Sequence, residues 1–354
     1  MASTTYNNDY QSRRESSKVN SSRYYAEYHG HLVEHLELLL PALRKSSDSL
    51  IWTAGDSSLD NKYWFQDHRA AVGAYREILD PPTMNADVTY WLNHLAREGT
   101  GSINTAVEAT TLQQRTWKLL PQDAFLRDNI QPSDTLIVSI GGNDVALAPT
   151  PCTICSMLSL VKMPFGCVKQ SCVCFTPPCN EHCYGCGPVG ISACCSASPP
   201  CLGYMNHLFG TRIQHYIEAL TSKTKPKRIL VCMIYYLDEN PTPSWAGMAL
   251  KSLGYDKDPE RLQYLIRKMY EGATSNIRIE DTTVIPVPLF DVLDGKKSDD
   301  YVARVEPSCQ GSQKMAKYFL DIIERDEKNP NFYSKRNAQA CSGPVESSYM
   351  LDRS

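Results

Sequence analysis

The fold of this chain is decided by the stretch Leu50-Ile51-Trp52-Thr53-Ala54, which runs directly into Gly55-Asp56-Ser57-Ser58. A second apolar run, Thr135-Leu136-Ile137-Val138-Ser139-Ile140, leads in the same way into Gly141-Gly142-Asn143-Asp144. Continuous apolar runs of this kind are typical of strands buried on both faces of a parallel sheet. Open α/β sheets place their ligands at the carboxyl ends of such strands. The two turns therefore bring a serine hydroxyl and an Asn amide to one edge, a combination suited to acyl transfer.

The composition of the chain limits the classes of protein to which we expect it to belong. The chain has 354 residues and a net charge of −3, which gives no indication of a nucleic-acid partner. No apolar run approaches the roughly 20 residues of a membrane span, and residues 1–23 lack the apolar core of a secretory signal. With 14 cysteines and no signal, we expect a cytoplasmic, reducing environment with free or metal-bound thiols rather than disulfides.

Apolar periodicity outlines the rest of the chain. We expect a disordered segment at 1–23, one α/β domain at 24–327 and a polar tail at 328–354. Strands alternate with helices within the domain, which favours a five-stranded parallel sheet between two helical layers, a three-layer α/β/α sandwich. The predicted strands are 49–54, 102–107, 135–140, 227–236 and 282–290, and the predicted helices are 24–45, 67–79, 87–98, a stretch ending near 129, 203–222, 262–270 and 310–324.

The two turns resemble conserved blocks of the SGNH hydrolases, also called GDSL esterases and lipases. Gly55-Asp56-Ser57 matches the Gly-Asp-Ser block after the first strand, and Gly141-Gly142-Asn143-Asp144 matches the Gly-x-Asn-Asp block after the third. The resemblance spans about residues 49–324, apart from a cysteine-rich insertion. It implies a flavodoxin-like sandwich, an ester substrate, Ser57 as nucleophile and the Asn143 amide in an oxyanion hole. Asp56 and Asp144 are expected to shape their turns instead.

The second block of that family supplies a Gly whose N–H faces the oxyanion. Ala106 stands about where this Gly is expected, with Gly101 as the competing position. A backbone N–H survives a change from Gly to Ala where the backbone angles permit it.

The last block departs most from the family pattern of Asp-x-x-His-Pro. This chain reads Ala303-Arg304-Val305-Glu306-Pro307, so Glu306 stands in the place of the histidine and Ala303 in that of the aspartate. A buried Glu with a raised pKa can serve as a general base and accept the Ser57 proton. A histidine reaching in from elsewhere is the alternative, because triads are defined by geometry and not by chain order; the candidates are His68, His207 and His215.

These residues leave two classes of function open. In one the protein is a hydrolase or acyltransferase acting on a small-molecule or lipid ester, without an organic cofactor. In the other the serine is unactivated and the domain is a catalytically inactive binding protein.

Residues 149–201 form the cysteine-rich insertion, which we expect to be irregular. Cys152-x-x-Cys155 and Cys183-x-x-Cys186 have the spacing of zinc ligands, so a structural zinc ion is one hypothesis, and a metal-binding interaction protein its functional counterpart. Free thiols are the alternative. The apolar part, 157–165, would suit an acyl chain or peripheral contact with a membrane. His31-Leu32-Val33-Glu34-His35 has the pattern of a zinc peptidase, but a solvated helix face is the favoured interpretation.

Overall fold

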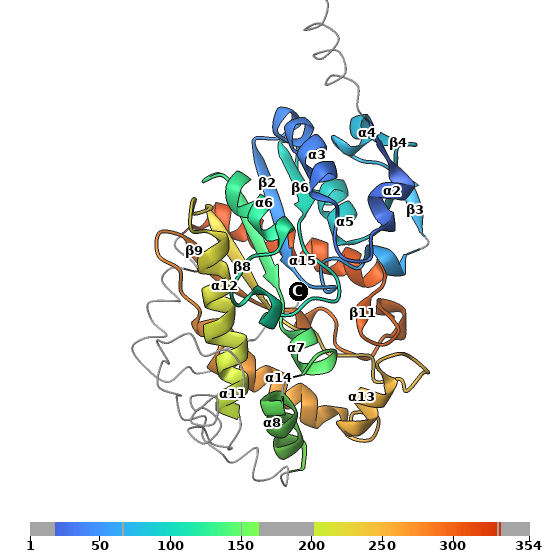
Figure 1. Ribbon diagram of the computed structural model, residues 1–354, viewed down its shortest axis with the longest axis vertical. Helices are drawn as coiled ribbons and strands as arrows, with labels where there is room; N and C mark the ends of the chain where they lie inside the picture. The colour runs from blue at the N-terminus through green and yellow to red at the C-terminus, as the bar shows by residue number, and fades with distance from the viewer. Residues whose placement is uncertain (1–17, 66, 150, 163–201, 331–332, 334–354) are drawn as a thin grey trace, which may run out of the picture.

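The structure is a computed structural model that describes residues 18–65, 67–149, 151–162, 202–330 and 333 (Figure 1). Its centre is a five-stranded sheet with the strand order β6-β2-β7-β8-β9. All neighbouring strands are parallel. Counted along the chain this order is 2-1-3-4-5, so the predicted flavodoxin-like arrangement is confirmed. The strands are β2 (Ser49–Gly55), β6 (Thr100–Asn104), β7 (Thr135–Ser139), β8 (Arg228–Met233) and β9 (Thr283–Pro288).

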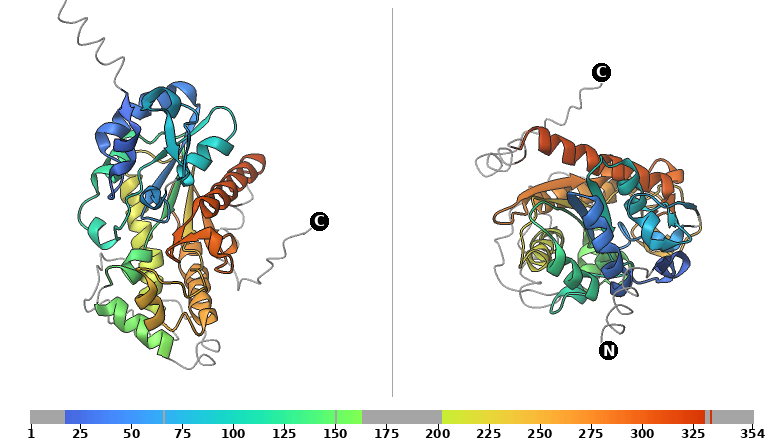
Figure 2. Two further views of the ribbon diagram at one scale, coloured as in Figure 1. Left: turned by 90° about the vertical axis from the view of Figure 1, so that its right-hand side faces the viewer. Right: turned by 90° about the horizontal axis from the view of Figure 1, so that it is seen from above.

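Helices cover both faces of the sheet and complete the three-layer sandwich (Figure 2). On one face, α5 (Val88–Leu95) packs against α15 (Cys309–Lys328). The other face carries α3 (Val33–Ser46), α6 (Pro121–Asn129) and α12 (Ile213–Leu220). The part of the chain between β8 and β9 contributes α13 (Gly247–Ser252) and α14 (Pro259–Gly272). None of the helices in the described part of the chain combines the length and apolar character that a bilayer span requires.

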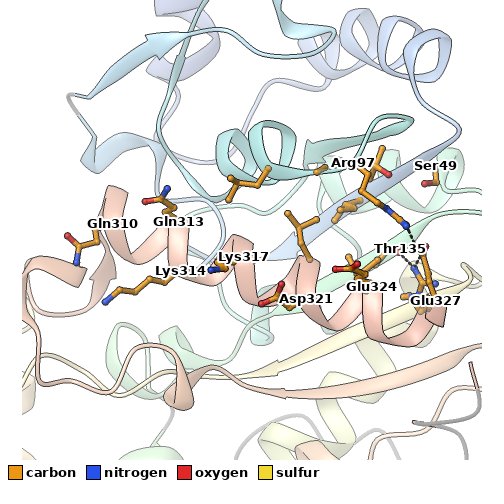
Figure 3. A pocket seen from close by; sticks show the side chains of 17 residues that line it. Ser49, Arg97, Thr135, Gln310, Gln313, Lys314, Lys317, Asp321, Glu324 and Glu327 are labelled. Atoms are coloured by element: carbon orange, nitrogen blue, oxygen red, sulfur yellow. Dashed lines mark hydrogen bonds and ion pairs between the residues drawn. The ribbon is translucent and has the colours of Figure 1, made fainter. Parts of the chain in front are cut away.

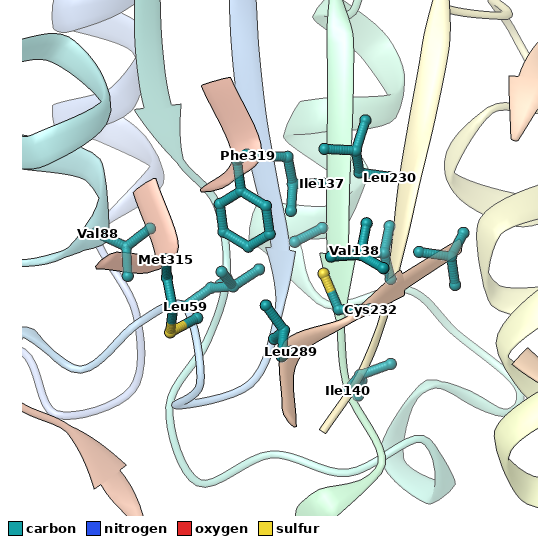
Figure 4. Packing of buried hydrophobic residues seen from close by; sticks show 14 of the residues in the cluster. Leu59, Val88, Ile137, Val138, Ile140, Leu230, Cys232, Leu289, Met315 and Phe319 are labelled. Atoms are coloured by element: carbon teal, nitrogen blue, oxygen red, sulfur yellow. The ribbon is translucent and has the colours of Figure 1, made fainter. Parts of the chain in front are cut away.

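The burial of the strands in the core explains why the sequence alone predicted them. Every residue of β7 and β8 is buried, as expected for strands covered on both faces. Figure 4 shows Met315 and Phe319 of α15 in the same buried cluster as Leu59, which follows the Ser57 turn. Cys232 of β8 belongs to this cluster and acts there as a small apolar side chain.

The first predicted helix, 24–45, is wrong as a single element. The structure has α2 (Ser21–Ala26), then a loop, then α3 from Val33. Helix α2 ends because Glu27, the residue after Ala26, is extended, and Gly30 in the loop has φ +81°, a left-handed conformation outside the range of an α-helix. The loop matters for function because it carries Tyr28 to the candidate site.

Two further predictions are corrected. The predicted helix 67–79 contains β3 (His68–Ala70), which pairs with β5 (Thr83–Asn85), and only the short α4 (Tyr75–Ile78) is helical. Tertiary pairing has overridden the local pattern there. Residues 151–162 of the insertion, expected to be irregular, form α8 (Pro151–Lys162). Met157 and Leu160 of α8 are buried in the core, so they are not available to an acyl chain or a membrane.

The chain ends are described only in part. Within the predicted disordered segment 1–23, residues 18–23 form β1 (Val19–Asn20) and the start of α2, while 1–17 lie outside the described residues. In the predicted tail 328–354, α15 ends at Lys328, and 331–332 and 334–354 lie outside the described residues.

The absence of a side chain at Gly55 allows the end of β2 to lie very close to the backbone of β7. It ends β2 with φ +134°, and a Cβ built on it would lie 1.8 Å from the Ser139 carbonyl oxygen of β7. We expect Gly55→Ala to lower the free energy of unfolding, because backbone must move to admit the methyl group. Gly254→Ala is the matched control, since Gly254 also has a positive φ, +74°, but faces open space.

The control measures backbone strain alone, which costs about 1–2 kcal/mol for an L-residue in this region. Urea denaturation of both variants should show a clearly larger loss for Gly55→Ala. Equal losses would mean that the contact with β7 does not constrain the turn.

Candidate functional site

Three segments far apart in the sequence meet at the carboxyl edge of the sheet. Ser57 follows β2, Asn143 opens α7 (Gly142–Ala146) after β7, and Glu306 lies on β11 (Glu306–Pro307), directly before α15. They border one cavity of about 310 Å³. Its described lining consists of Tyr28, Ser57, Trp64, Glu108, Ala109, Asn143, Leu147, Trp245 and Glu306.

Ser57 and Glu306 are in direct contact. The Ser57 hydroxyl donates a hydrogen bond to Glu306 Oε1 at 3.1 Å, across 249 positions of sequence. Burial raises the pKa of Glu306 to about 8, against the lowering effect of the Ser57 hydrogen bond. Glu306 Oε2 is buried and has no hydrogen-bond partner among the described residues. The carboxyl is therefore free to take up a proton near neutral pH.

The turn that presents Ser57 is held by its neighbours. The carboxylate of Asp56 accepts hydrogen bonds from the N–H and the hydroxyl of Ser58, at 3.1 and 2.8 Å. The Ser58 hydroxyl also donates to Ser139 Oγ at 2.7 Å, which ties the turn to β7. Burial raises the pKa of Asp56 to about 6. Asp56 therefore shapes the turn, as expected, and leaves Ser57 to face the cavity.

The second block lies differently from the sequence prediction. Ala106 is fully buried, and its N–H donates to Asn104 Oδ1 at 3.0 Å, so this donor is already in use. Ala109 lines the cavity instead, with φ +55°. Within the described chain, the N–H groups of Ala109 and Ser57 make no hydrogen bond. Gly101, the competing position, lies in β6 opposite Leu50.

Asn143 lies on the wall of the cavity. Its Nδ2 donates one hydrogen bond to the Thr110 carbonyl at 3.0 Å, which fixes the amide and leaves its second N–H. The carboxylate of Asp144 accepts from the N–H groups of Leu112 and Gln113, at 2.8 and 3.2 Å. Asp144 thus has the structural role expected of it and holds the second-block loop in place.

Asp60 connects the Ser57 turn to the second block. It forms an ion pair with Lys62 at 2.8 Å, in which both side chains are fully buried. The same carboxylate accepts from Asn104 Nδ2 at 3.0 Å and from the Glu108 N–H at 3.0 Å. One buried group thus fixes the loop that carries Glu108 and Ala109.

Asn61, the next residue, connects the turn to the Glu306 segment. Its Nδ2 donates to the Pro307 carbonyl at 2.7 Å and to Ser312 Oγ at 3.1 Å. The Asn61 amide therefore holds β11 and the start of α15 beside the Ser57 turn.

None of the histidines considered as an alternative base borders the cavity in the described chain. His68 lies on β3 with Nδ1 2.8 Å from Asn85 Oδ1. His207 is mostly buried in α11 (Leu202–His207), which lowers its pKa to about 4, and His215 lies in α12. His31 is not on a solvated helix face: it is buried before α3, with Nδ1 2.9 Å from the Tyr24 carbonyl oxygen.

The zinc hypothesis falls mainly outside the described residues. Cys183 and Cys186 lie there, and of Cys152 and Cys155 only the helical backbone is described. Elsewhere in the described chain no group of three or more potential ligands gathers around a metal position. Zinc binding stays a prediction.

Several lining residues were missed from the sequence. Glu108 and Ala109 lie within residues 104–111, the stretch that resembles the second block, so their position was the available signal. Tyr28 was hidden by the predicted helix, and Trp245 comes from a segment without periodicity. Trp64 lies after the first predicted strand, in a segment without a motif.

A larger cavity of about 660 Å³ lies at the opposite, amino-terminal ends of the strands (Figure 3). It runs along α15 and is bordered by residues such as Ser49, Thr135 and Lys314. Arg97 forms an ion pair with Glu327 across it. This larger cavity contains none of the motif residues, so the size of a cavity does not identify the candidate site.

Comparison with known proteins gives a distant likeness in fold. No family model matches the chain, and no curated protein matches it in sequence. The solved structures it matches include a carbohydrate acetylesterase from Sinorhizobium meliloti, at 12% identity and TM-score 0.37, covering 78% of this chain and 98% of that one.

An aryl esterase from M. smegmatis matches at 14% identity and TM-score 0.37, covering 78% of this chain and 99% of the other. A GDSL-like protein from Parabacteroides merdae matches at 15% identity and TM-score 0.36, covering 78% and 95%. These values are low, so the functional proposal below rests on the geometry of the site.

The buried ion pair between Asp60 and Lys62 allows the structural support of the site to be tested. We expect Asp60→Asn to lower the free energy of unfolding by about 3–5 kcal/mol, because it leaves the Lys62 ammonium buried and unpaired. Asp67→Asn is the control, since the Asp67–Arg69 pair is exposed and should be worth at most about 1 kcal/mol. Urea denaturation measures both. A loss no larger than that of the control would show that Asp60 does not organise the loops.

Proposed function

We propose that the protein is a serine-dependent ester hydrolase or acyltransferase in which Glu306 is the general base. The observation that carries this proposal is the hydrogen bond from the Ser57 hydroxyl to Glu306 Oε1 inside a cavity. A nucleophile within reach of a base of suitable pKa is the essential arrangement of covalent acyl transfer. The absence of imidazole from the described lining leaves this carboxylate as the base.

The chemical steps follow from that contact. Ser57 Oγ attacks the ester carbonyl carbon while its proton passes to the ionised Glu306. Protonated Glu306 then gives this proton to the departing alkoxide, which leaves as an alcohol and forms the acyl-enzyme. Water, or another alcohol, attacks the acyl carbon, and its proton returns through Glu306 to Ser57 Oγ.

The opposite wall supplies donors for the oxyanion. We assign this role to the N–H groups of Ser57 and Ala109 and to the second N–H of the Asn143 amide, with Ala109 replacing Ala106 of the sequence prediction. The positive φ of Ala109 and the hydrogen bond from Asn143 to Thr110 support this assignment, because both hold the donors in fixed positions. Loss of one such donor typically lowers kcat by about 10²–10³.

A carboxylate base differs physically from an imidazole. Imidazole needs a partner that selects its tautomer, whereas either oxygen of a carboxylate accepts a proton. Ala303 stands in the place of the family's aspartate. The proposed base Glu306 needs no such partner, so the absence of the aspartate does not argue against it. The raised pKa has a cost, because most of the Glu306 carboxyl is protonated and inactive at neutral pH.

Labelling by a fluorophosphonate tests the nucleophile, since only an activated serine reacts readily with it. We expect wild type to gain one phosphonyl group by intact-mass spectrometry, and Ser57→Ala to gain none. Ser58→Ala is the control, because Ser58 is the adjacent buried hydroxyl and donates to Asp56 rather than to Glu306. An unlabelled wild type, or labelling that survives Ser57→Ala, would favour the inactive binding protein or a different nucleophile.

The pH dependence of turnover tests the base. Only ionised Glu306 accepts a proton, so kcat/KM for p-nitrophenyl acetate should rise with pH and level off above about 8. Glu306→Gln should remove this rise and most of the activity.

The stability of Glu306→Gln separates chemistry from unfolding. A carboxyl whose pKa is raised by folding stabilises the native state less as the pH rises from its unfolded value toward about 8. The variant should therefore be at least as stable as wild type at pH 9. Full activity in a folded Glu306→Gln variant would contradict the assignment.

A further inference from the structure

The wall of the cavity beside Ser57 combines aromatic and acidic side chains. Three aromatic side chains, Tyr28, Trp64 and Trp245, line it together with two carboxyl groups, Glu108 and Glu306. The aromatic surface continues beyond the cavity, because the Tyr63 ring packs edge-on against both Tyr28 and Trp64. Tyr28 and Trp245 remain partly exposed at the mouth, 38% and 43%, and are therefore accessible to an entering ligand.

Each carboxyl group keeps one oxygen without a partner. Trp64 Nε1 donates to Glu108 Oε1 at 2.6 Å, while Glu108 Oε2 is buried with no hydrogen bond in the described chain. Glu306 is arranged in the same way, with Oε1 bound to Ser57 and Oε2 unpartnered. The two residues are only 1% and 5% exposed. Buried polar atoms without partners are costly, so these two carboxyl oxygens favour a ligand that brings either an N–H donor or a positive charge beside them.

The ionisable carboxyl groups of the wall give it negative charge once they ionise, above a pH of about 8. The described lining contains no lysine, arginine or histidine. Lys62 is fully buried and engaged by Asp60. Burial, followed by the charges of Asp60 and Glu306, raises the pKa of Glu108 to about 8. Burial, and then the charges of Glu108 and Glu306, raise the pKa of Tyr28, which lines the same cavity.

We propose that this wall binds an ammonium group, so that the preferred substrates are esters carrying a small quaternary or protonated amine, of the choline type. Aromatic faces attract such cations, and a positive charge between Glu108 and Glu306 offsets the repulsion of two close carboxylates. A cavity of about 310 Å³ has room for a molecule of this size. The substrate class rests on the proposed ester hydrolysis, but the cation site is testable without it.

Binding of choline to the full-length protein is the first test, because it needs no catalysis. Calorimetry should show choline binding at least about tenfold more tightly than 3,3-dimethylbutanol, which has the same shape without the charge; tenfold corresponds to about 1.4 kcal/mol, within the range of a partly buried cation–π site. Equal affinities, or no choline binding, would overturn the proposal. Tighter binding of the uncharged alcohol or of an acetylated sugar would assign the wall to neutral ligands.

Variants of the lining residues test whether the cation binds to this wall. Glu108→Gln keeps an oxygen to accept from Trp64 Nε1 but removes the charge, and should weaken choline binding about tenfold. Trp245→Ala should do the same by removing an aromatic face. Trp117→Ala is the matched control, because Trp117 is 83% exposed and does not border the cavity. Unchanged choline affinity in both cavity variants would contradict the assignment.

Kinetics separate this proposal from the proposed function. We expect a higher kcat/KM for acetylcholine than for 3,3-dimethylbutyl acetate, measured by titrating the acid released, and a collapse of this ratio in Glu108→Gln. Equal hydrolysis of both esters would reject the cation site while the hydrolase stands. Choline binding without hydrolysis of either ester would keep the cation site and reject the hydrolase.

Discussion

The buried ion pair between Asp60 and Lys62 is the interaction on which the site depends. A carboxylate without solvent is stable only when its lone pairs are matched, and Asp60 meets this need with Lys62, Asn104 and the Glu108 N–H. Those partners belong to the Ser57 turn and to the loop after β6. Asn61 in turn binds the segment of Glu306, so Asp60 and Asn61 together connect the Ser57 turn to two further walls of the cavity.

The sheet could be predicted because its strands are buried on both faces and therefore read as unbroken apolar runs. Ser57 and Asn143 followed from the positions of their turns, which the parallel topology gathers at one edge. Glu306 followed from the resemblance of residues 303–307 to the last block of the SGNH hydrolases. The rest depended on local geometry that periodicity does not encode. The side chain of Asn104 accepts the Ala106 N–H, and Ala109 lines the cavity instead. The chain leaves the helical conformation at Glu27, so Tyr28 lies in a loop that borders the cavity.

Replacing an imidazole by a carboxyl group changes the electrostatics of the whole cavity. An imidazolium would leave a positive charge beside the nucleophile, whereas Glu306 adds a negative one to that of Glu108. Burial limits the cost by raising both pKa values to about 8. The same repulsion favours a cation in the cavity, so the proposed base and the proposed substrate class have a single physical cause.

The most direct test of the central claim is a crystal structure of the protein after reaction with a small fluorophosphonate. The account predicts phosphorus bonded to Ser57 Oγ and the phosphoryl oxygen within hydrogen-bond distance of the Ser57 N–H, the Ala109 N–H and Asn143 Nδ2. Glu306 should lie beside Ser57 Oγ with no histidine near it. Phosphorus on another residue, or a phosphoryl oxygen directed away from Ala109 and Asn143, would contradict the account.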